Sequence, residues 1–258
     1  MVKKDSAQQF ETHFSALYGE RWLRLRGALL AAPKKISMIN PFGLAEYALD
    51  PASLYPIEQL DLKPGMRIAD FCASPGGKSL AGIFALRGQG EWFCNDLSPG
   101  RVARLKAVLH DCLPPEILAR VRVSCSDASR WGMRWKGEFD RILVDAPCSG
   151  ERHLLASPQE LARWSLKGSK RLAMRQHALL CSAADCLRPG GRLVYSTCSI
   201  SEVENDLVID KLLKSRPGQI TVETCELATG EGTRHGRVFL PDREYGGPIY
   251  LCALKKFQ

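Results

Sequence analysis

The sequence has no apolar run that approaches the roughly 18 residues needed to cross a membrane. Its first residues show neither the hydrophobic core of a signal peptide nor an arginine-rich transit segment. We therefore expect no membrane partner. The expected location is the cytoplasm, or the mitochondrial matrix if the chain is a processed eukaryotic product.

None of the ten cysteines forms a Cys-x-x-Cys pair. A zinc site normally draws ligands from such pairs, so the spacing predicts no metal site. A disulfide framework is also unexpected in a chain of 258 residues without a secretion signal. We infer a reducing compartment, in which most of these cysteines are small core residues.

The chain has fewer acidic than basic residues: 28 Asp and Glu against 36 Lys and Arg, which gives a net charge of +8. The excess is uneven: residues 98–177 contain 15 basic and 8 acidic residues, and residues 1–36 contain 7 and 3. This balance favours nucleic acid or another polyanion as partner. Solvated helix faces explain any single basic run equally well.

Apolar runs and amphipathic segments alternate along most of the chain. Strands are expected at residues 67–72, 91–96, 121–125, 139–144, in the run before Cys198, and near 237–240 and 249–254. Helices are expected at 76–86, 98–112, from 157 to 187 with a break near Gly168, and at 201–213. The pattern predicts an α/β fold with a doubly wound, mostly parallel sheet of seven strands.

An N-terminal helical extension precedes this pattern. Residues 6–32 show helical spacing interrupted at Gly19, and the proline-punctuated residues 33–62 are expected to be irregular. We therefore divide the chain into an extension and lead-in, 1–62, and a main domain, 63–258. The arginines at 21, 24 and 26 either belong to a cap packed on that domain or contact RNA.

The segment CASPGGK at residues 72–78 joins a strand to a helix start. Its glycines allow a ligand to approach the backbone, and a helix N-terminus favours a carboxylate or phosphate. The segment matches neither GxGxxG nor the phosphate-binding GxxxxGK[ST], so alone it is weak evidence.

Three acids follow successive expected strands: Asp96, Asp127 and Asp145. Asp96 is placed to bind the ribose hydroxyls of a nucleoside cofactor, and Asp127 to bind an adenine amine. Each acid alone is equally compatible with a helix N-cap. Together they predict a nucleoside pocket at the carboxyl ends of the strands.

Two cysteines also follow apolar runs, within the segments DAPCSG (145–150) and YSTCS (195–199). Because ligands bind outside the carboxyl ends of parallel strands, Cys148 and Cys198 are expected to face one pocket. We assign Cys198 as a nucleophile. The inverted assignment to Cys148 stays open, since Pro-Cys is the nucleophile dipeptide of DNA cytosine-5 enzymes.

CASPGGK, the strand-end acids, DAPCSG and YSTCS occur in an order and spacing that resembles the Sun-type (NSUN/RsmB-like) RNA cytosine-5 methyltransferases. The resemblance spans residues 67–215. The flanking segments are similar, more loosely, to the short single-domain members that include the mitochondrial ribosomal-RNA enzyme. The resemblance implies a class I Rossmann-like methyltransferase that uses S-adenosylmethionine.

The resemblance also implies residue roles. Cys198 would attack carbon 6 of cytosine, which makes carbon 5 able to accept the methyl group. Cys148 would help to release the product, Asp145 would bind the base, and Lys78 would approach it. The cofactor would contact the following residues: Cys72, Ala73, Ser74, Pro75, Gly76, Gly77, Lys78, Asp96, Asp127 and Asp145.

One departure from the family pattern follows the first cysteine. Many members continue with Gly-Thr-Gly, whereas this chain has Glu151-Arg152-His153. Because of this departure, the target nucleotide is not inferred from other members of the family. His153, which lies in the departing segment, is a weak candidate for a general base. The residues expected to contact RNA phosphates are Arg152, Arg163, Lys167, Lys170, Arg171 and Arg175. Trp164 either stacks on a base or is buried.

The leading interpretation is RNA cytosine-5 methylation, with ribosomal RNA as the first candidate substrate and transfer RNA as the second. No RNA-targeting domain is recognisable, so an accessory RNA-targeting protein is a further expected partner. A DNA methyltransferase and an amine methyltransferase are rival enzymes, and the amine reaction needs no cysteine nucleophile. A cofactor-binding RNA-assembly factor with little turnover is the non-catalytic alternative.

Overall fold

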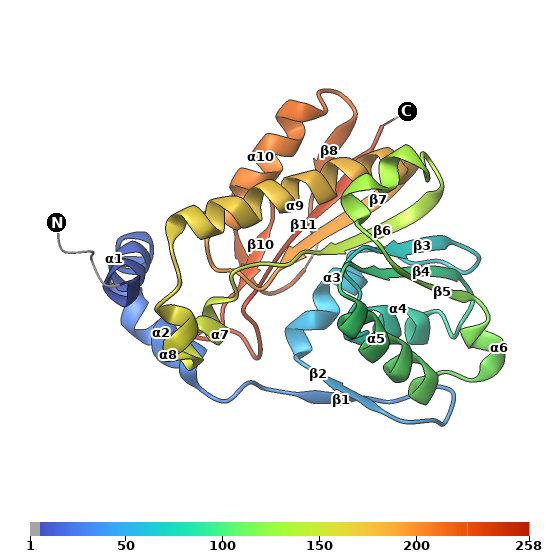
Figure 1. Ribbon diagram of the computed structural model, residues 1–258, viewed down its shortest axis with the longest axis horizontal. Helices are drawn as coiled ribbons and strands as arrows, with labels where there is room; N and C mark the ends of the chain where they lie inside the picture. Colours follow the sequence, from blue (N-terminus) through green and yellow to red (C-terminus); the bar gives the residue numbers. More distant parts are fainter. Residues whose placement is uncertain (1–5, 226, 258) are drawn as a thin grey trace.

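A sheet of nine strands organises the computed structural model, which describes residues 6–225 and 227–257 (Figure 1). The strand order is β5-β4-β3-β6-β7-β11-β10-β9, and β8 pairs with β11. The strands are β3 (Arg67–Asp70), β4 (Glu91–Asp96), β5 (Val121–Cys125), β6 (Phe139–Asp145), β7 (Leu187–Thr197), β8 (Ile220–Glu223), β9 (Glu231–Gly232), β10 (Arg237–Phe239) and β11 (Ile249–Lys256).

The doubly wound α/β class is confirmed, and the strand count is corrected from seven to nine among the described residues. Strands β3 to β7 are parallel, whereas β8, β10 and β11 add antiparallel pairs at one side. The two strands that the sequence does not predict are β8 and β9. They have four and two residues, too few to show an alternating pattern.

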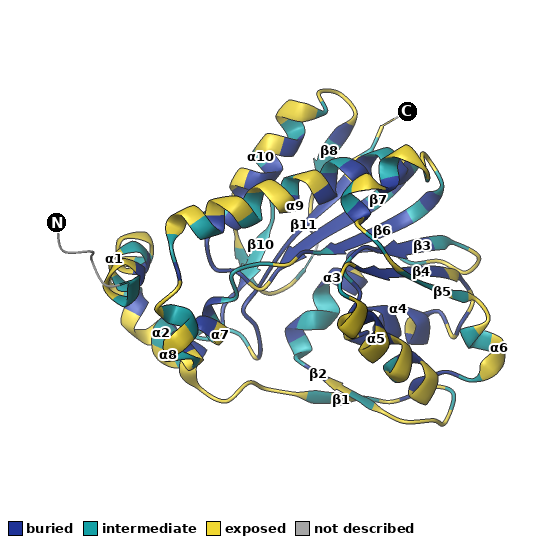
Figure 2. Ribbon diagram, viewed as in Figure 1, coloured by how far each residue is buried: buried dark blue, intermediate teal, exposed yellow. Residues whose placement is uncertain are grey.

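Successive residues of the parallel strands point to opposite faces, and both faces are apolar. Ile68 and Trp92 pack on one side with α4 (Gly77–Ala85) and α5 (Pro99–Cys112). Ala69 and Phe93 pack on the other with α9 (Leu166–Cys186), and α10 (Asp206–Ser215) covers the same face. Such burial on both faces is typical of parallel sheets, and Figure 2 shows the strands buried beneath exposed helix faces.

Short elements fill the connections around the sheet. The structure contains α3 (Tyr55–Glu58), α6 (Pro115–Leu118), α7 (Glu151–Ala156) and α8 (Pro158–Leu161). Its 3-10 turns are η1 (Gly19–Arg21), η2 (Pro51–Leu54), η3 (Ala128–Met133) and η4 (Glu202–Glu204). Three of these short elements follow the carboxyl ends of parallel strands: η3 after β5, α7 after β6 and η4 after β7.

The predicted break near Gly168 is wrong in position. Helix α9 runs through Gly168, and the interruption lies at residues 162–165, between α8 and α9. The hydroxyl of Ser165 accepts a hydrogen bond from the Gly168 amide at 3.1 Å. Gly168 therefore lies in the capped first turn, where a glycine costs little.

The N-terminal extension forms two helices, α1 (Ser6–Tyr18) and α2 (Trp22–Leu30), separated by η1 at the predicted interruption. Phe10, Phe14 and Trp22 pack with Leu154 of α7 and with Trp164. Arg21 donates hydrogen bonds to Glu231 and Asp242, and Arg24 pairs with Asp242. These arginines therefore belong to a packed cap.

The lead-in is more regular than expected. Strands β1 (Ile36–Met38) and β2 (Tyr47–Leu49) form an antiparallel hairpin, followed by η2 and α3. Each strand has three residues, too short for sequence periodicity to reveal. Residues 1–5, on which part of the targeting argument rests, lie outside the described residues. No helix in the described part of the chain combines the length and hydrophobicity of a membrane span.

Candidate active site

The loops after β3, β6 and β7 meet at one edge of the sheet. These three strands are parallel neighbours, and β3 lies where the strand order reverses. From β3 the chain proceeds outward through β4 and β5, then returns to β6 on the other side. Such a reversal leaves a crevice outside the carboxyl ends of the strands, where open α/β sheets bind ligands.

The two cysteines lie in contact at this edge. Cys148 follows β6 and Cys198 follows β7, and their Sγ atoms are 2.9 Å apart. The backbone amide of Cys198 donates to the Cys148 sulfur at 3.3 Å. The contact with Cys198, together with burial, raises the pKa of Cys148 well above its ordinary value. Cys198 is exposed and Cys148 half-buried, so the two sulfurs differ in environment.

Asp145 ends β6 beside the cysteines and joins two further groups. Its Oδ2 accepts a hydrogen bond from Lys78 Nζ at 2.8 Å, and its Oδ1 accepts one from Ser196 Oγ at 2.8 Å. Burial lowers the pKa of Lys78, but the charges of Asp145 and Cys198 raise it to a net value above the ordinary one. Lys78 is therefore held as a cation next to the sulfurs.

The 72–78 segment lines a cavity of about 150 Å³ together with Asp70 and Asp145. All of its predicted residues border this cavity except Gly76. That glycine has φ +119°, and a Cβ there would lie 3.1 Å from Leu105 of α5. Gly76 therefore shapes the loop and its packing against α5.

Asp70 is a site residue that the sequence analysis does not single out. It is buried, its Oδ2 accepts from Ser79 Oγ at 2.7 Å, and its Oδ1 has no hydrogen-bond partner. Burial raises the pKa of this carboxyl to about 7. Asp70 lines the 72–78 cavity, and an ammonium group bound there would supply the donor that its Oδ1 lacks.

A larger cavity of about 450 Å³ adjoins the first and shares Cys72 and Asp145 with it. Asp96 lines it, confirming that the acid after β4 lies beside the 72–78 segment. Arg101 donates to Asp96 Oδ2 at 2.9 Å and to the Ser74 carbonyl at 2.6 Å. Each carboxylate oxygen can accept a second hydrogen bond, so Asp96 retains capacity for a diol.

Asp127 lies in a different cavity, bordered by Phe93, Arg130 and Trp131. Its Oδ1 accepts from the amide and the hydroxyl of Ser129 and so caps η3. The structure therefore does not bring Asp127 into the cavity that Cys72 and Asp96 share.

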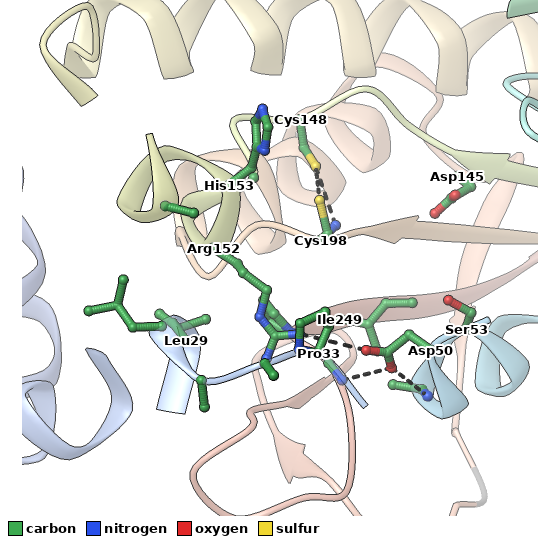
Figure 3. Close-up of a pocket in the computed structure, with 18 of the residues that line it drawn as sticks. Leu29, Pro33, Asp50, Ser53, Asp145, Cys148, Arg152, His153, Cys198 and Ile249 are labelled. Carbon is green, nitrogen blue, oxygen red and sulfur yellow. Dashed lines mark hydrogen bonds and ion pairs between the residues drawn. The ribbon is translucent and has the colours of Figure 1, made fainter. Parts of the chain in front are cut away.

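A third cavity, of about 570 Å³, also reaches the cysteines and is bordered by the end of α2 and by Asp50. Figure 3 shows Cys148 and Cys198 on one wall and the Asp50–Arg152 pair on another. Arg152 Nη1 lies 3.7 Å from Asp50 Oδ2, and its buried Nε has no partner. Lys78, Asp145, Cys148 and Cys198 line this cavity too, so it meets the first two at the reactive groups.

Five basic residues lie on α9 or in the segment before it, and some of them border a cavity that reaches Cys148. Arg163, Arg171 and Arg175 border a cavity of about 550 Å³ that reaches Cys148. Lys167 and Lys170 are exposed on the first turns of α9, outside that cavity. Among the described residues none of the five takes part in an ion pair of 4.0 Å or less.

Trp164 and His153 are placed by their neighbours. Trp164 is buried, with its ring 5.2 Å from Phe10, so burial and not base stacking explains it. His153 is exposed at the rim of the third cavity and pairs with Glu160 at 3.1 Å. Residues 6–225 and 227–257 contain no group of three or more His, Cys, Asp or Glu side chains able to hold a metal ion.

A family model for the 16S rRNA methyltransferases RsmB/F matches residues 57–255. The chain belongs to this family. Its match covers the whole sheet and every strand-end loop described above, which confirms the resemblance drawn from the motifs.

Relatives of known name include the mitochondrial tRNA (cytosine(34)-C(5))-methyltransferase of Danio rerio, 35% identical over 81% of this chain and 60% of the relative. The 5-cytosine rRNA methyltransferase NSUN4 of Xenopus laevis is 39% identical over 73% of this chain and 47% of its own length. The chain thus spans about half to two thirds of these relatives. NSun6 of Pyrococcus horikoshii, solved with the S-adenosylmethionine analogue SFG, is 25% identical over 88% of this chain and 57% of its own, with TM-score 0.72.

Proposed function

We propose that the protein is an S-adenosylmethionine-dependent RNA methyltransferase that modifies carbon 5 of a cytosine. One observation supports this most strongly: two cavities meet at Cys148, Cys198 and the Asp145–Lys78 pair. One cavity contains Asp96, the acid predicted to bind the ribose, and the other leaves room for a second substrate. Methyl transfer needs two substrates brought together at one point.

The residues of the first two cavities fit the cofactor. S-adenosylmethionine supplies an activated methyl group on a sulfonium when bound. Asp70 offers an unpartnered buried oxygen for its ammonium, and the start of α4 offers backbone amides for its carboxylate. Asp96 offers oxygens for the ribose, and we retain Asp127 as a proposed adenine contact. The cavity of about 450 Å³ falls in the range of small-molecule sites, roughly 300 to 1,000 Å³, and the adjoining cavity of about 150 Å³ extends it.

In the proposed reaction the base enters the third cavity and Cys198 attacks carbon 6. Both cysteines line that cavity; the more exposed Cys198 is assigned the attack, and Cys148 assists release. Asp145 accepts hydrogen bonds from the base, and the Lys78 cation stabilises negative charge that develops on the ring. Carbon 5 would take the methyl group that the bound cofactor supplies. The carbon-5 proton would then pass to solvent water in the cavity while the bond from carbon 6 to sulfur breaks, which returns Cys198 as a thiolate and restores the aromatic ring.

Ribosomal RNA is the proposed substrate, and transfer RNA is the second candidate. The printed names of the relatives include both RNA classes, as cited above. Phosphate contacts are proposed for six residues that line the third cavity, lie on α9 or lie in the segment before it: Arg152, Arg163, Lys167, Lys170, Arg171 and Arg175. An accessory RNA-targeting protein is a further proposed partner.

We also propose the organisation and location of the chain. Residues 63–258 form the methyltransferase domain, and residues 1–62 form an extension that packs on α7 and α8 through the aromatic cluster. All ten cysteines are free thiols, which suits a reducing compartment, either the cytoplasm or the mitochondrial matrix.

The proposal is tested by incubating the purified protein with isotopically labelled S-adenosylmethionine and host ribosomal or transfer RNA. Nucleoside mass spectrometry should then find labelled 5-methylcytidine in one RNA class, and Cys198→Ala should abolish it. Label in another nucleoside, or 5-methylcytidine formed equally by Cys198→Ala, would contradict the proposal.

A further inference from the structure

Two fully buried carboxyl groups, Glu151 and Glu204, lie beneath the cysteines and have no part in the proposed reaction. Glu151 is the first residue of α7, three residues after Cys148. Glu204 ends η4, six residues after Cys198. Each cysteine loop therefore leads directly into one of the two acids.

A single hydroxyl joins the two acids. Ser149 Oγ lies 2.5 Å from Glu151 Oε1 and 2.5 Å from Glu204 Oε1. That hydroxyl has one proton and can donate to only one of the two oxygens. The second contact is favourable when the other carboxyl oxygen carries a proton. The raised pKa of Glu151 agrees with a proton held between the two acids.

The remaining bonds tie the acids to both cysteine loops. Glu151 accepts from Ser199 Oγ at 3.0 Å and from the Ile200 amide at 3.0 Å. Glu204 accepts from the Ser149 amide at 2.9 Å and from Gln176 Nε2 at 3.0 Å. Neither acid takes part in an ion pair within the described chain. The pair thus fixes the residues that directly follow Cys148 and Cys198.

The other titratable or charged groups near the pair come from four elements. Tyr18 of α1 donates to the Ile200 carbonyl, and Tyr195 of β7 donates to the Glu204 carbonyl. Cys148 lies on the adjoining loop, and Arg175 of α9 borders the same cavity as Ser149. Burial, together with the charge of Glu204, raises the pKa of Glu151 to about 7.

The charge around the two sulfurs is unequal. Glu151 and Glu204 act on Cys148 and, after its contact with Cys198 and burial, further raise its pKa. Cys198 instead interacts electrostatically with the cations of Lys78 and Arg152. Since the sulfurs are 2.9 Å apart, ionising both at once would place two like charges in contact.

We propose that Glu151 and Glu204 are positioning residues that share a proton, bind both cysteine loops and disfavour ionisation of Cys148, which leaves the role of nucleophile to Cys198. This inference rests on the proposed function for the role of Cys198. It gives a physical reason why, of two cysteines in contact, one attacks the base and the other does not.

The test is the pH profile of iodoacetamide alkylation, read for each cysteine by peptide mass spectrometry. Cys148 is followed in a Cys198→Ala background, and Cys198 in a Cys148→Ala background. The pair is altered by Glu151→Gln, Glu204→Gln and both together. Glu202→Gln removes an exposed charge from the same turn, η4, and serves as the matched control.

We expect the double variant to lower the midpoint for Cys148 by at least one pH unit. At pH 8 this corresponds to roughly tenfold faster alkylation. The pair loses its shared proton above about pH 7, so each single variant removes one carboxylate at pH 8 and should give part of that shift. Cys198 should change less than threefold, and the control should change neither cysteine.

An unchanged Cys148 profile in the single variants would overturn the inference, even if the double variant fails to fold. A lower melting temperature with an unchanged profile would show a structural role only. The assay needs neither RNA nor cofactor, so its failure leaves methylation untouched. Conversely, the expected profile without 5-methylcytidine formation would contradict the proposed function alone.

Discussion

At the residue scale, the site depends on acids whose environments differ widely. Asp96 is buried against Arg101 beside the 72–78 segment, whereas Asp127 is exposed and caps η3. A buried acid that already lines the cavity loses more when its charge is removed than an exposed one. The two acids should therefore contribute unequally to cofactor binding.

We predict that Asp96→Asn weakens S-adenosylmethionine binding at least tenfold and Asp127→Asn only about threefold, as measured by isothermal titration calorimetry. Equal losses would show that the η3 loop closes over the cofactor. No loss for Asp96→Asn would remove the ribose assignment. No loss for Asp127→Asn would leave that residue as a helix cap only.

The sequence motifs predict which residues belong to the site, but they do not predict the hydrogen bonds that those residues make. Cys148 and Cys198 could be expected to share a pocket because each follows an apolar strand. Asp70 could not be singled out, since only the fold buries one of its oxygens without a partner. Glu151 was similarly hidden, because Glu151-Arg152 at a helix start looks like ordinary surface.

At the element scale, the loop after β7 is fixed by a network of short contacts. Thr197 Oγ1 donates to Asn205 Oδ1 at 2.6 Å, and Asn205 Nδ2 donates to the Ser199 carbonyl at 2.9 Å. Glu151 adds the bonds to Ser199 and Ile200 described above. The titration of Glu151 should therefore be visible in the stability of the folded protein.

The folded state raises the pKa of Glu151 from 4.5 to about 7, so the folded protein binds this proton more tightly than the unfolded chain. Its contribution to the free energy of unfolding is fully present below about pH 4.5 and is lost as the pH rises through 7. The difference between wild type and Glu151→Gln should fall by about 3 kcal/mol over that range. Urea unfolding at pH 5 and 8 measures it.

Asp70 titrates in the same range in both proteins and cancels in this comparison. A stability difference between wild type and Glu151→Gln that is equal at pH 5 and 8 would contradict a raised Glu151 pKa.

Most helices and strands were predictable from the sequence, with exceptions at short ones such as β1, β8 and β9. Three or fewer residues per face give no readable period, and their pairing is set by contacts distant in sequence.

At the scale of the whole molecule, the net charge of +8 is concentrated around one region. The α9 cations have no ion-pair partners among the described residues, whereas Arg21 and Arg24 are paired within the cap. Composition alone does not distinguish the basic residues of α9 from the arginines of the N-terminal extension. The structure does, because Glu231 of β9 and Asp242, in the loop after β10, pair with the N-terminal arginines and not with those of α9.

We predict that Arg171→Gln/Arg175→Gln lowers RNA affinity and reduces the slope of log affinity against log salt by about 1.5, since each phosphate contact contributes roughly 0.7 to 0.9. Arg104→Gln/Lys106→Gln makes the same charge change on the exposed side of α5 and should leave the slope nearly unchanged. Filter binding between 50 and 200 mM salt measures both. Equal slopes for the two variants would show that only net charge matters.

The central claim is that Cys198 bonds to a cytosine in RNA and that Cys148 releases it. The most direct measurement is to express Cys148→Ala in the organism of origin, purify it under denaturing conditions and sequence any RNA still attached. We expect a stable adduct that is enriched for one RNA and absent from the Cys148→Ala/Cys198→Ala double variant. An adduct that persists in the double variant, or none from a folded, cofactor-binding Cys148→Ala protein, would contradict these cysteine roles.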